Sequence, residues 1–145
     1  MADKDVKKPK AKAVHTDPDT SATPEQEPLP PAVTKKSPEQ KSPAEWAYQR
    51  LVLYIQNFEK QLKPEHEVAI GLTGSEAGVI RIEGIGFFDP DMITFYGYDP
   101  TGARTQLIQH VSQLNVALRA MPKPTGETEA RRIGFRLAES LEDDE

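Results

Sequence analysis

Apolar residues recur at helical spacing in the segment 43–62 and leave the opposite face polar. The apolar stripe consists of Ala47, Leu51, Tyr54, Ile55, Phe58 and Leu62. Ser42 and Pro43 are typical of a helix start, because the serine oxygen can accept from a first-turn amide and proline suits the first helical position. Glu45 can reach back to the Ser42 amide, and Pro64 ends the segment. The pattern predicts one amphipathic helix.

Alternation of apolar and polar positions replaces the helical spacing further along the chain. It covers residues 68–83 on both sides of a glycine-containing turn at 73–78, which predicts an antiparallel hairpin. The sequence Gly84-Ile85-Gly86 interrupts the second strand, and glycine inside a strand is typical of a bulge or a sharp bend. After a turn at Asp89-Pro90-Asp91, residues 93–98 predict a third strand.

The segment 104–121 fits two structures, a helical stripe or two alternating strands with a break near Ser112. We predict strands, because the preceding Asp99-Pro-Thr-Gly102 has the composition of a hairpin turn and because of a resemblance given below. Ile133, Phe135 and Leu137 alternate with polar or small residues, which predicts a last short strand. The acidic end, 139–145, is predicted to fray.

The first 41 residues show no such periodicity and are rich in proline, lysine and glutamate. They contain more than half of the 13 prolines and no aromatic residue. Such a composition cannot bury enough apolar area to offset the entropy of ordering it, so we predict a disordered tail over 1–41. The lysines before residue 13 form a small basic cluster, either an arm for nucleic acid or an acidic partner, or part of a solvated linker. A single domain is predicted over 42–138.

Composition excludes several classes of protein. The chain has no cysteine, which rules out disulfide scaffolds and thiolate metal sites. Its net charge is −5, and the excess of acids falls after residue 42, which argues against a broad phosphate-binding face. No apolar run is long enough to span a membrane, and the start does not resemble a signal peptide. We expect a cytoplasmic protein with no membrane partner.

The sequence offers few groups for catalysis. There are three histidines, and no pair has metal-ligand spacing. His110 and Ser112 share a face of one predicted strand and resemble a base with a nucleophile, but no carboxylate or oxyanion motif accompanies them. The carboxylates of Asp89 and Asp91 are explained by turn formation. We therefore predict that the protein is not an enzyme and has neither a cofactor nor a metal site.

Two blocks, Thr105–Asn115 and Arg131-Arg-Ile-Gly-Phe135, resemble a bacterial family of uncharacterised proteins. This resemblance covers residues 43–137 and implies no activity. A more distant resemblance is to the Sm-like barrel family, which includes Hfq-type RNA chaperones and implies an N-terminal helix followed by five strongly bent antiparallel strands. It rests on Gly84, on Phe88-Asp89, on Met92, and on Gln109-His110 followed by Val-Ser.

The chain departs from the Sm-like pattern where that family contacts RNA. Ile93 stands where Sm proteins commonly have an asparagine, and Ile108 and Gln109 stand where the Hfq type has tyrosine and lysine. The segment after Pro122 has no counterpart. The resemblance therefore implies the fold without implying the RNA site, because a fold does not fix a function.

The predicted fold class is α+β, an amphipathic N-terminal helix followed by a small, strongly bent five- to six-stranded antiparallel sheet or Sm-like barrel. We expect a small non-catalytic interaction module that binds a protein partner or self-associates through exposed strand edges. An Sm-like (Hfq-type) oligomeric RNA-binding protein is the first alternative, and a minor enzyme or ligand-binding protein is the second. The candidate binding residues are Gln109, His110, Arg104 and Arg81 for RNA, with Trp46 and Tyr48 as a partner surface or as aromatics sealing the core.

Overall fold

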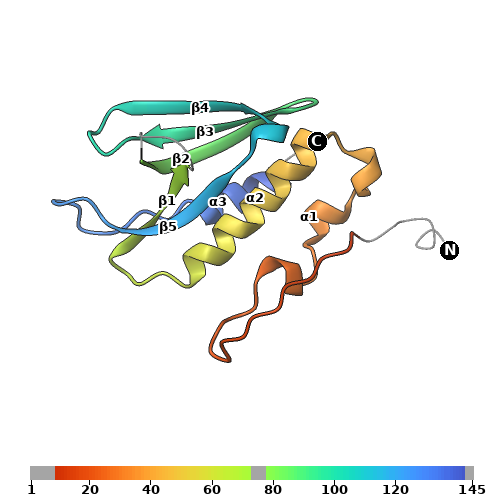
Figure 1. The fold of residues 1–145 in the computed structure, drawn as a ribbon, viewed down its shortest axis with the longest axis horizontal. Coiled ribbons are helices and arrows are strands. Elements are labelled where there is room, and N and C mark those ends of the chain that lie inside the picture. The colour runs from red at the N-terminus through yellow and green to blue at the C-terminus, as the bar shows by residue number, and fades with distance from the viewer. Residues whose placement is uncertain (1–8, 73–77, 143–145) are drawn as a thin grey trace.

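A long helix packs against an open antiparallel sheet in the computed structural model, which describes residues 9–72 and 78–142 (Figure 1). The helices are α1 (Pro31–Thr34), α2 (Pro43–Lys60) and α3 (Gly134–Glu142). The strands are β1 (His66–Leu72), β2 (Val79–Phe88), β3 (Met92–Tyr98), β4 (Arg104–His110) and β5 (Val116–Pro122). The order across the sheet is β4-β3-β2-β1-β5, and all pairs are antiparallel. The predicted α+β class is confirmed, and the sheet is not closed.

The sheet changes direction within β2. The start of this strand pairs with β1, and the register of its pairing with β3 shifts between Ile82 and Gly84. A side chain at Gly97, opposite this shift, would collide with the carbonyl oxygen of Arg81. Gly84, the first glycine of the predicted bend, therefore borders a register shift of the kind that a β-bulge produces, and such a shift bends a strand.

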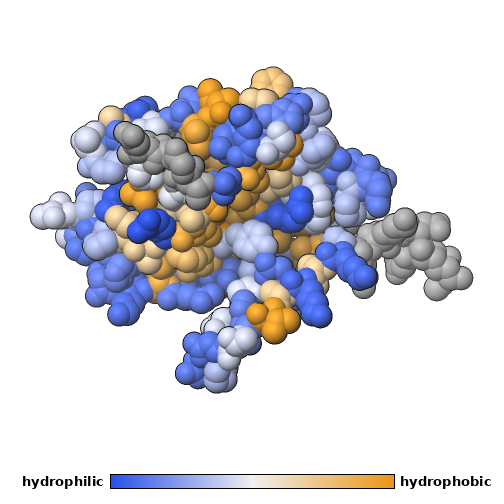
Figure 2. Space-filling view, in the orientation of Figure 1, coloured by the Kyte–Doolittle hydropathy of each residue, from blue (hydrophilic) through white to orange (hydrophobic). Residues whose placement is uncertain are grey.

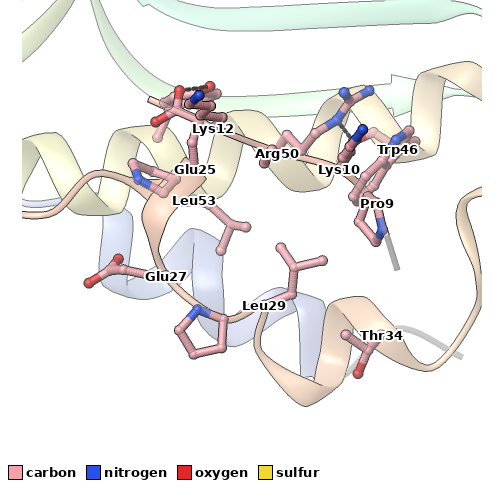
Figure 3. A pocket seen from close by; sticks show the side chains of 14 residues that line it. Pro9, Lys10, Lys12, Glu25, Glu27, Leu29, Thr34, Trp46, Arg50 and Leu53 are labelled. Carbon is pink, nitrogen blue, oxygen red and sulfur yellow. Dashed lines mark hydrogen bonds between the residues drawn. The ribbon is translucent and has the colours of Figure 1, made fainter. Parts of the chain in front are cut away.

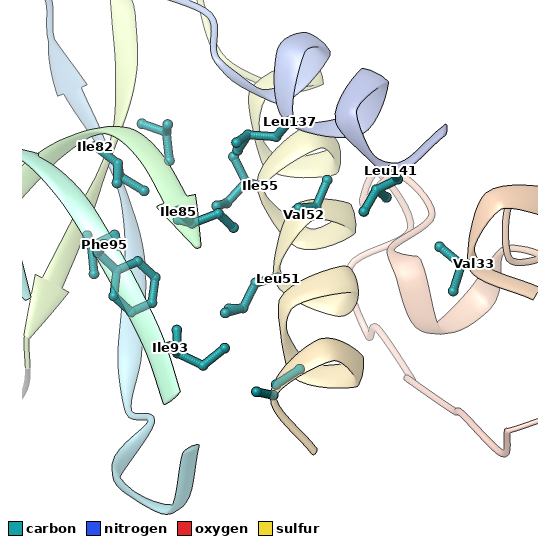
Figure 4. Packing of buried hydrophobic residues seen from close by; sticks show 14 residues of the cluster. Val33, Leu51, Val52, Ile55, Ile82, Ile85, Ile93, Phe95, Leu137 and Leu141 are labelled. Carbon is teal, nitrogen blue, oxygen red and sulfur yellow. The ribbon is translucent and has the colours of Figure 1, made fainter. Parts of the chain in front are cut away.

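The helix α2 begins as predicted and forms one wall of the core. The Ser42 hydroxyl accepts a hydrogen bond from the Glu45 amide at 3.0 Å. The Glu45 carboxylate lies 3.1 Å from the Lys36 ammonium instead of reaching back to the Ser42 amide. Figure 4 shows Leu51, Val52 and Ile55 of α2 between side chains of the sheet and those of α3. Tyr54, which the stripe included, is exposed instead, because the buried face is centred on its neighbours.

The segment 104–121 forms strands, as predicted. A short 3₁₀ turn, Val111–Gln113, separates β4 from β5. The turn before β4 is closed by hydrogen bonds from the Asp99 amide to the Ala103 carbonyl and from the Gly102 amide to the Asp99 carbonyl, both 2.9 Å. Gly102 has a φ of +88°, which glycine adopts without strain. The predicted turn at 73–78, apart from Gly78, lies outside the described residues.

The predicted last strand over 133–137 is wrong, because these residues lead into and form the helix α3. Leu137 and Leu141, four residues apart, are buried on one face of this helix. The Glu59 carboxylate accepts hydrogen bonds from the amides of Ile133 (2.9 Å) and Gly134 (2.7 Å) and so caps the start of the helix. Of the end that the sequence predicts to fray, residues 139–142 belong to α3, and residues 143–145 lie outside the described residues.

The N-terminal segment departs from the prediction of an unstructured tail. Residues 9–41, called the strap below, run along α2 and contain α1 and two 3₁₀ turns, Pro24–Gln26 and Pro38–Gln40 (Figure 1). Val33 is only 1% exposed and joins the core cluster. The Lys41 ammonium donates to the Val33 carbonyl and to Gln49 Oε1, both at 2.6 Å. The strap is ordered because a few of its apolar side chains pack against the helices of the domain.

We expect Val33→Ala to lower the free energy of unfolding by about 1.5 kcal/mol, because it removes two buried carbon groups. Val14→Ala is the matched control in the same strap, since Val14 is exposed and its replacement should change little. Urea unfolding of both variants measures the difference. Equal stability of the two variants would show that the strap does not pack on the domain in solution.

Candidate interaction surface

The aromatic candidates Trp46 and Tyr48 on α2 pack at the edge of the core. The Trp46 ring is covered by the Lys41 ammonium and the Arg50 guanidinium, each 4.3 Å from the ring centroid. The ring centroids of Tyr48 and Phe87 are 5.1 Å apart, and the Tyr48 hydroxyl lies 3.3 Å from Ser140 Oγ. Both aromatics are partly buried against the core cluster, which is the sealing role that the sequence left open.

The two candidate arginines are held by other residues of the domain. Arg81 lies 3.1 Å from Glu67 Oε1 and donates to the Pro122 carbonyl at 2.8 Å. Arg104 is exposed at the start of β4, with its guanidinium 5.5 Å from the Tyr98 ring and 3.7 Å from Glu83 Oε2. Arg104 and His110 occupy opposite ends of β4, about 20 Å apart for an extended strand. The four RNA candidates therefore do not converge on one site.

His110 belongs to a hydrogen-bonded group of three side chains, of which the sequence predicted His110 and Ser112 but not the carboxylate. Its Nε2 lies 3.1 Å from Asp91 Oδ2, and its Nδ1 lies 2.8 Å from Ser112 Oγ. Nδ1 also accepts from the Ser112 amide at 3.0 Å, so the ring caps the 3₁₀ turn that follows β4. Gln109 Nε2 donates to the Gln113 carbonyl of the same turn at 3.4 Å. All of these groups stabilise the turn.

The sequence missed Asp91 because 19 residues separate it from His110. The signal was present in the predicted hairpin, since β3 and β4 place Met92 opposite His110 and so bring Asp91 beside the ring. All three side chains lie at the molecular surface. The hydrogen bonds that join Asp91, His110 and Ser112 therefore order the turn after β4. We assign no reaction to these three residues.

The two outer strands of the sheet carry the most distinctive surface. Within the described residues, β4 pairs only with β3, and β5 pairs only with β1. A groove of about 410 Å³ lies between α2 and β5. It is lined by Leu51, Tyr54, Ile55, Leu114, Asn115, Val116 and Leu118. Figure 2 shows apolar side chains gathered across this face, over β5 and the adjoining part of α2.

The other edge also exposes apolar side chains. Ile108 on this edge is 60% exposed, whereas Phe88, 77% exposed, lies at the end of the inner strand β2. The register places Ile108 opposite Thr94 on the outer face of the sheet, away from buried Phe95. The sequence indicated exposed edges but missed the groove, because α2 and β5 are far apart in the chain.

Over residues 9–72 and 78–142, no group of three or more His, Asp or Glu side chains is placed to hold a metal ion. In the same ranges, no helix has the length and apolar character needed to cross a membrane.

A helix backed by an open, bent five-stranded sheet defines a small α+β domain. The chain belongs to a family of unknown function, DUF6173, whose model matches residues 38–136. The match spans α2, the whole sheet and the start of α3, and it confirms the resemblance to an uncharacterised family. No curated protein and no solved structure matches the chain.

Proposed function

We propose that the protein is a non-catalytic interaction module that self-associates by pairing β4 of one copy with β5 of the next. The observation that carries this proposal is the apolar groove beside the unpaired edge of β5. A second unpaired edge, β4, belongs to the same sheet. An unpaired edge presents free backbone donors and acceptors to any strand that approaches, and natural proteins usually cover or block such edges.

Side chains on the two edges are compatible with such a pair. Leu118 on β5 lies opposite buried Ile70, so Ala117 next to it faces the outer side of the sheet. Ile108 on β4 faces the outer side as well. A continuous sheet made from two copies would bring the exposed isoleucine near the small alanine, and cross-strand apolar pairs stabilise sheets.

The contact joins two different strands, so it is heterologous, and repeated contacts of this kind form a ring or an open chain. We therefore expect the full-length protein to be larger than one chain in light scattering coupled to gel filtration at about 50–100 μM. This range covers the affinity expected for a standard-size or smaller interface.

The variant Ile108→Lys tests the edge directly. It places a charge on an edge strand, a common means by which proteins block strand pairing, and the position is exposed enough for the fold to accept lysine. We expect a single-chain mass and an unchanged melting temperature. Phe135→Lys is the matched control, because Phe135 is 70% exposed and belongs to α3, which is not a strand of the sheet. A single-chain mass for the parent, or an unchanged mass for Ile108→Lys, would contradict the proposal.

The alternative of an Sm-like RNA-binding protein has the helix followed by five bent antiparallel strands in its favour. Its candidate cations speak against it, because Arg81 is engaged by Glu67 and the chain carries a net charge of −5. Affinity for nucleic acid comes mainly from basic groups that displace counterions. We therefore place RNA binding below self-association.

A further inference from the structure

A cavity of about 780 Å³ lies between the strap and the outer face of α2 (Figure 3). Leu53 of α2 and Leu29 of the strap form its apolar walls, and Trp46 and Arg50 lie at one end. Its volume falls within the range of about 300–1,000 Å³ that is usual for small-molecule sites. The walls belong to the strap and to α2, and each of these segments also packs against other parts of the domain. The cavity is the space that remains between them where the strap crosses α2.

Hydrogen bonds fix the strap at the sides of this cavity. The Tyr54 hydroxyl donates to the Glu25 carboxylate, and Asn57 Nδ2 donates to the Ala22 carbonyl at 2.9 Å. The hydrogen bond to Tyr54 lowers the pKa of Glu25, which keeps this carboxylate charged and engaged. These contacts hold the strap over α2 while leaving the space between Leu29 and Leu53 unfilled.

Arg50 gives the cavity a positive end. Its Nε donates to the Trp46 carbonyl at 3.2 Å, and its guanidinium lies over the Trp46 ring. In the part of the chain that the structure describes, no carboxylate forms an ion pair with it. Arg50 remains exposed at the mouth of the cavity, and partial desolvation lowers the pKa of its guanidinium.

The remaining charged groups around the cavity are Lys10, Lys12 and Glu27 from the strap, besides the engaged Glu25. Among the described residues 9–72 and 78–142, three cations thus face two carboxylates, one of which is already bonded to Tyr54. A guanidinium presents its donors in a fork that matches carboxylate, phosphate or sulfonate oxygens. The cavity therefore combines an apolar middle with an anion-binding end.

We propose that this cavity binds an anionic amphiphile, an organic anion with an apolar chain. The anionic head pairs with the free guanidinium nitrogens of Arg50, and the chain lies between Leu29 and Leu53. The proposal does not rest on self-association, because no strand of the sheet lines the cavity; Tyr54 of α2 borders both this cavity and the groove beside β5.

Decanoate is the probe, with 1-decanol as its uncharged match. Trp46 is the single tryptophan of the chain, so its fluorescence reports on the cavity. We expect a saturable change on titration of the full-length protein with decanoate below its micellar concentration. Affinity for decanol should be at least about tenfold weaker, as expected for the loss of a charge-assisted hydrogen bond.

Three variants separate this site from general binding to apolar surface. Their affinities are measured by calorimetry, because Arg50 lies over the Trp46 ring and its replacement would itself change the fluorescence. Arg50→Gln should reduce decanoate affinity about tenfold and leave decanol unchanged. Leu53→Phe should weaken both ligands by narrowing the cavity. Lys60→Gln, which removes an exposed charge from the end of the same helix, should behave as the parent. The absence of saturable binding, equal affinity for decanoate and decanol, or an unchanged affinity in Arg50→Gln would overturn the proposal.

Discussion

Replacing Gly97 by alanine should lower the free energy of unfolding by at least about 3 kcal/mol, at the upper end of the range for overpacking a core. A Cβ at this position meets the backbone carbonyl of Arg81 and lies 3.0 Å from the Ile80 side chain. Backbone of a neighbouring strand cannot move aside as a flexible side chain can. The variant must therefore open the pairing of β2 with β3 at the bend of the sheet.

Gly84→Ala is the matched control on the other side of the bulge. Its Cβ would lie 3.9 Å from Tyr96 Cδ2, which is ordinary contact, so stability should stay within about 1 kcal/mol of the parent. Urea unfolding of the two variants gives the comparison. Equal stabilities would show that the tight approach at Gly97 does not exist in solution.

Glu67→Ala should lower the free energy of unfolding by about 3 kcal/mol. Glu67 is 3% exposed, pairs with Arg81 at 3.1 Å and accepts from the Arg131 amide at 2.9 Å. Its loss leaves a partly buried guanidinium without its carboxylate, and removing one partner of a buried pair costs more than the pair contributes. It also releases the segment that leads into α3.

Glu83→Gln is the matched control for this carboxylate. Glu83 is more exposed, and its ion pairs with Arg104 and Arg131 are longer, at 3.7 and 3.8 Å. Exposed pairs of this kind contribute less than about 1 kcal/mol. Thermal and urea unfolding should therefore separate the two variants clearly. A loss at Glu83 as large as that at Glu67 would contradict the assignment of the buried pair.

Local patterns predicted most of the domain because the signals for α2 and the strands lie within a few residues. The Ser42 cap, the glycines of the bend and the Asp99–Gly102 turn each specify a backbone geometry locally. The short segment 133–137 was ambiguous, because alternation over five residues also fits one face of a helix. What decides it is the Glu59 carboxylate, which caps α3 from a distant part of the chain.

The strap and the surfaces were harder to predict because, like the start of α3, they depend on contacts between segments that are remote in sequence. The composition of residues 9–41 describes an average, whereas three residues, Leu29, Ala32 and Val33, supply the apolar contacts with the core cluster. The groove at β5 and the cavity at Arg50 each need two segments that are remote in sequence. The sequence indicated the candidate residues singly and could not show that Arg81 is engaged by the buried carboxylate of Glu67.

The most direct measurement of the central claim, self-association through the sheet edges, is site-specific cross-linking. The chain has no cysteine, so one can be introduced at Gln106 on β4 in one batch and at Arg119 on β5 in another. The two batches are mixed and treated with a short bismaleimide, which tolerates a small error in the assumed register. Phe135→Cys on α3 replaces either partner as the control.

We predict cross-linked dimers in the mixture of β4 and β5 variants that are absent when either is mixed with the α3 variant. The yield should fall when Ile108→Lys is added to the β4 variant, because the charge blocks strand pairing. Cross-linking that is equal in all mixtures, or absent from the β4 and β5 mixture at concentrations where the parent is larger than one chain, would contradict edge pairing.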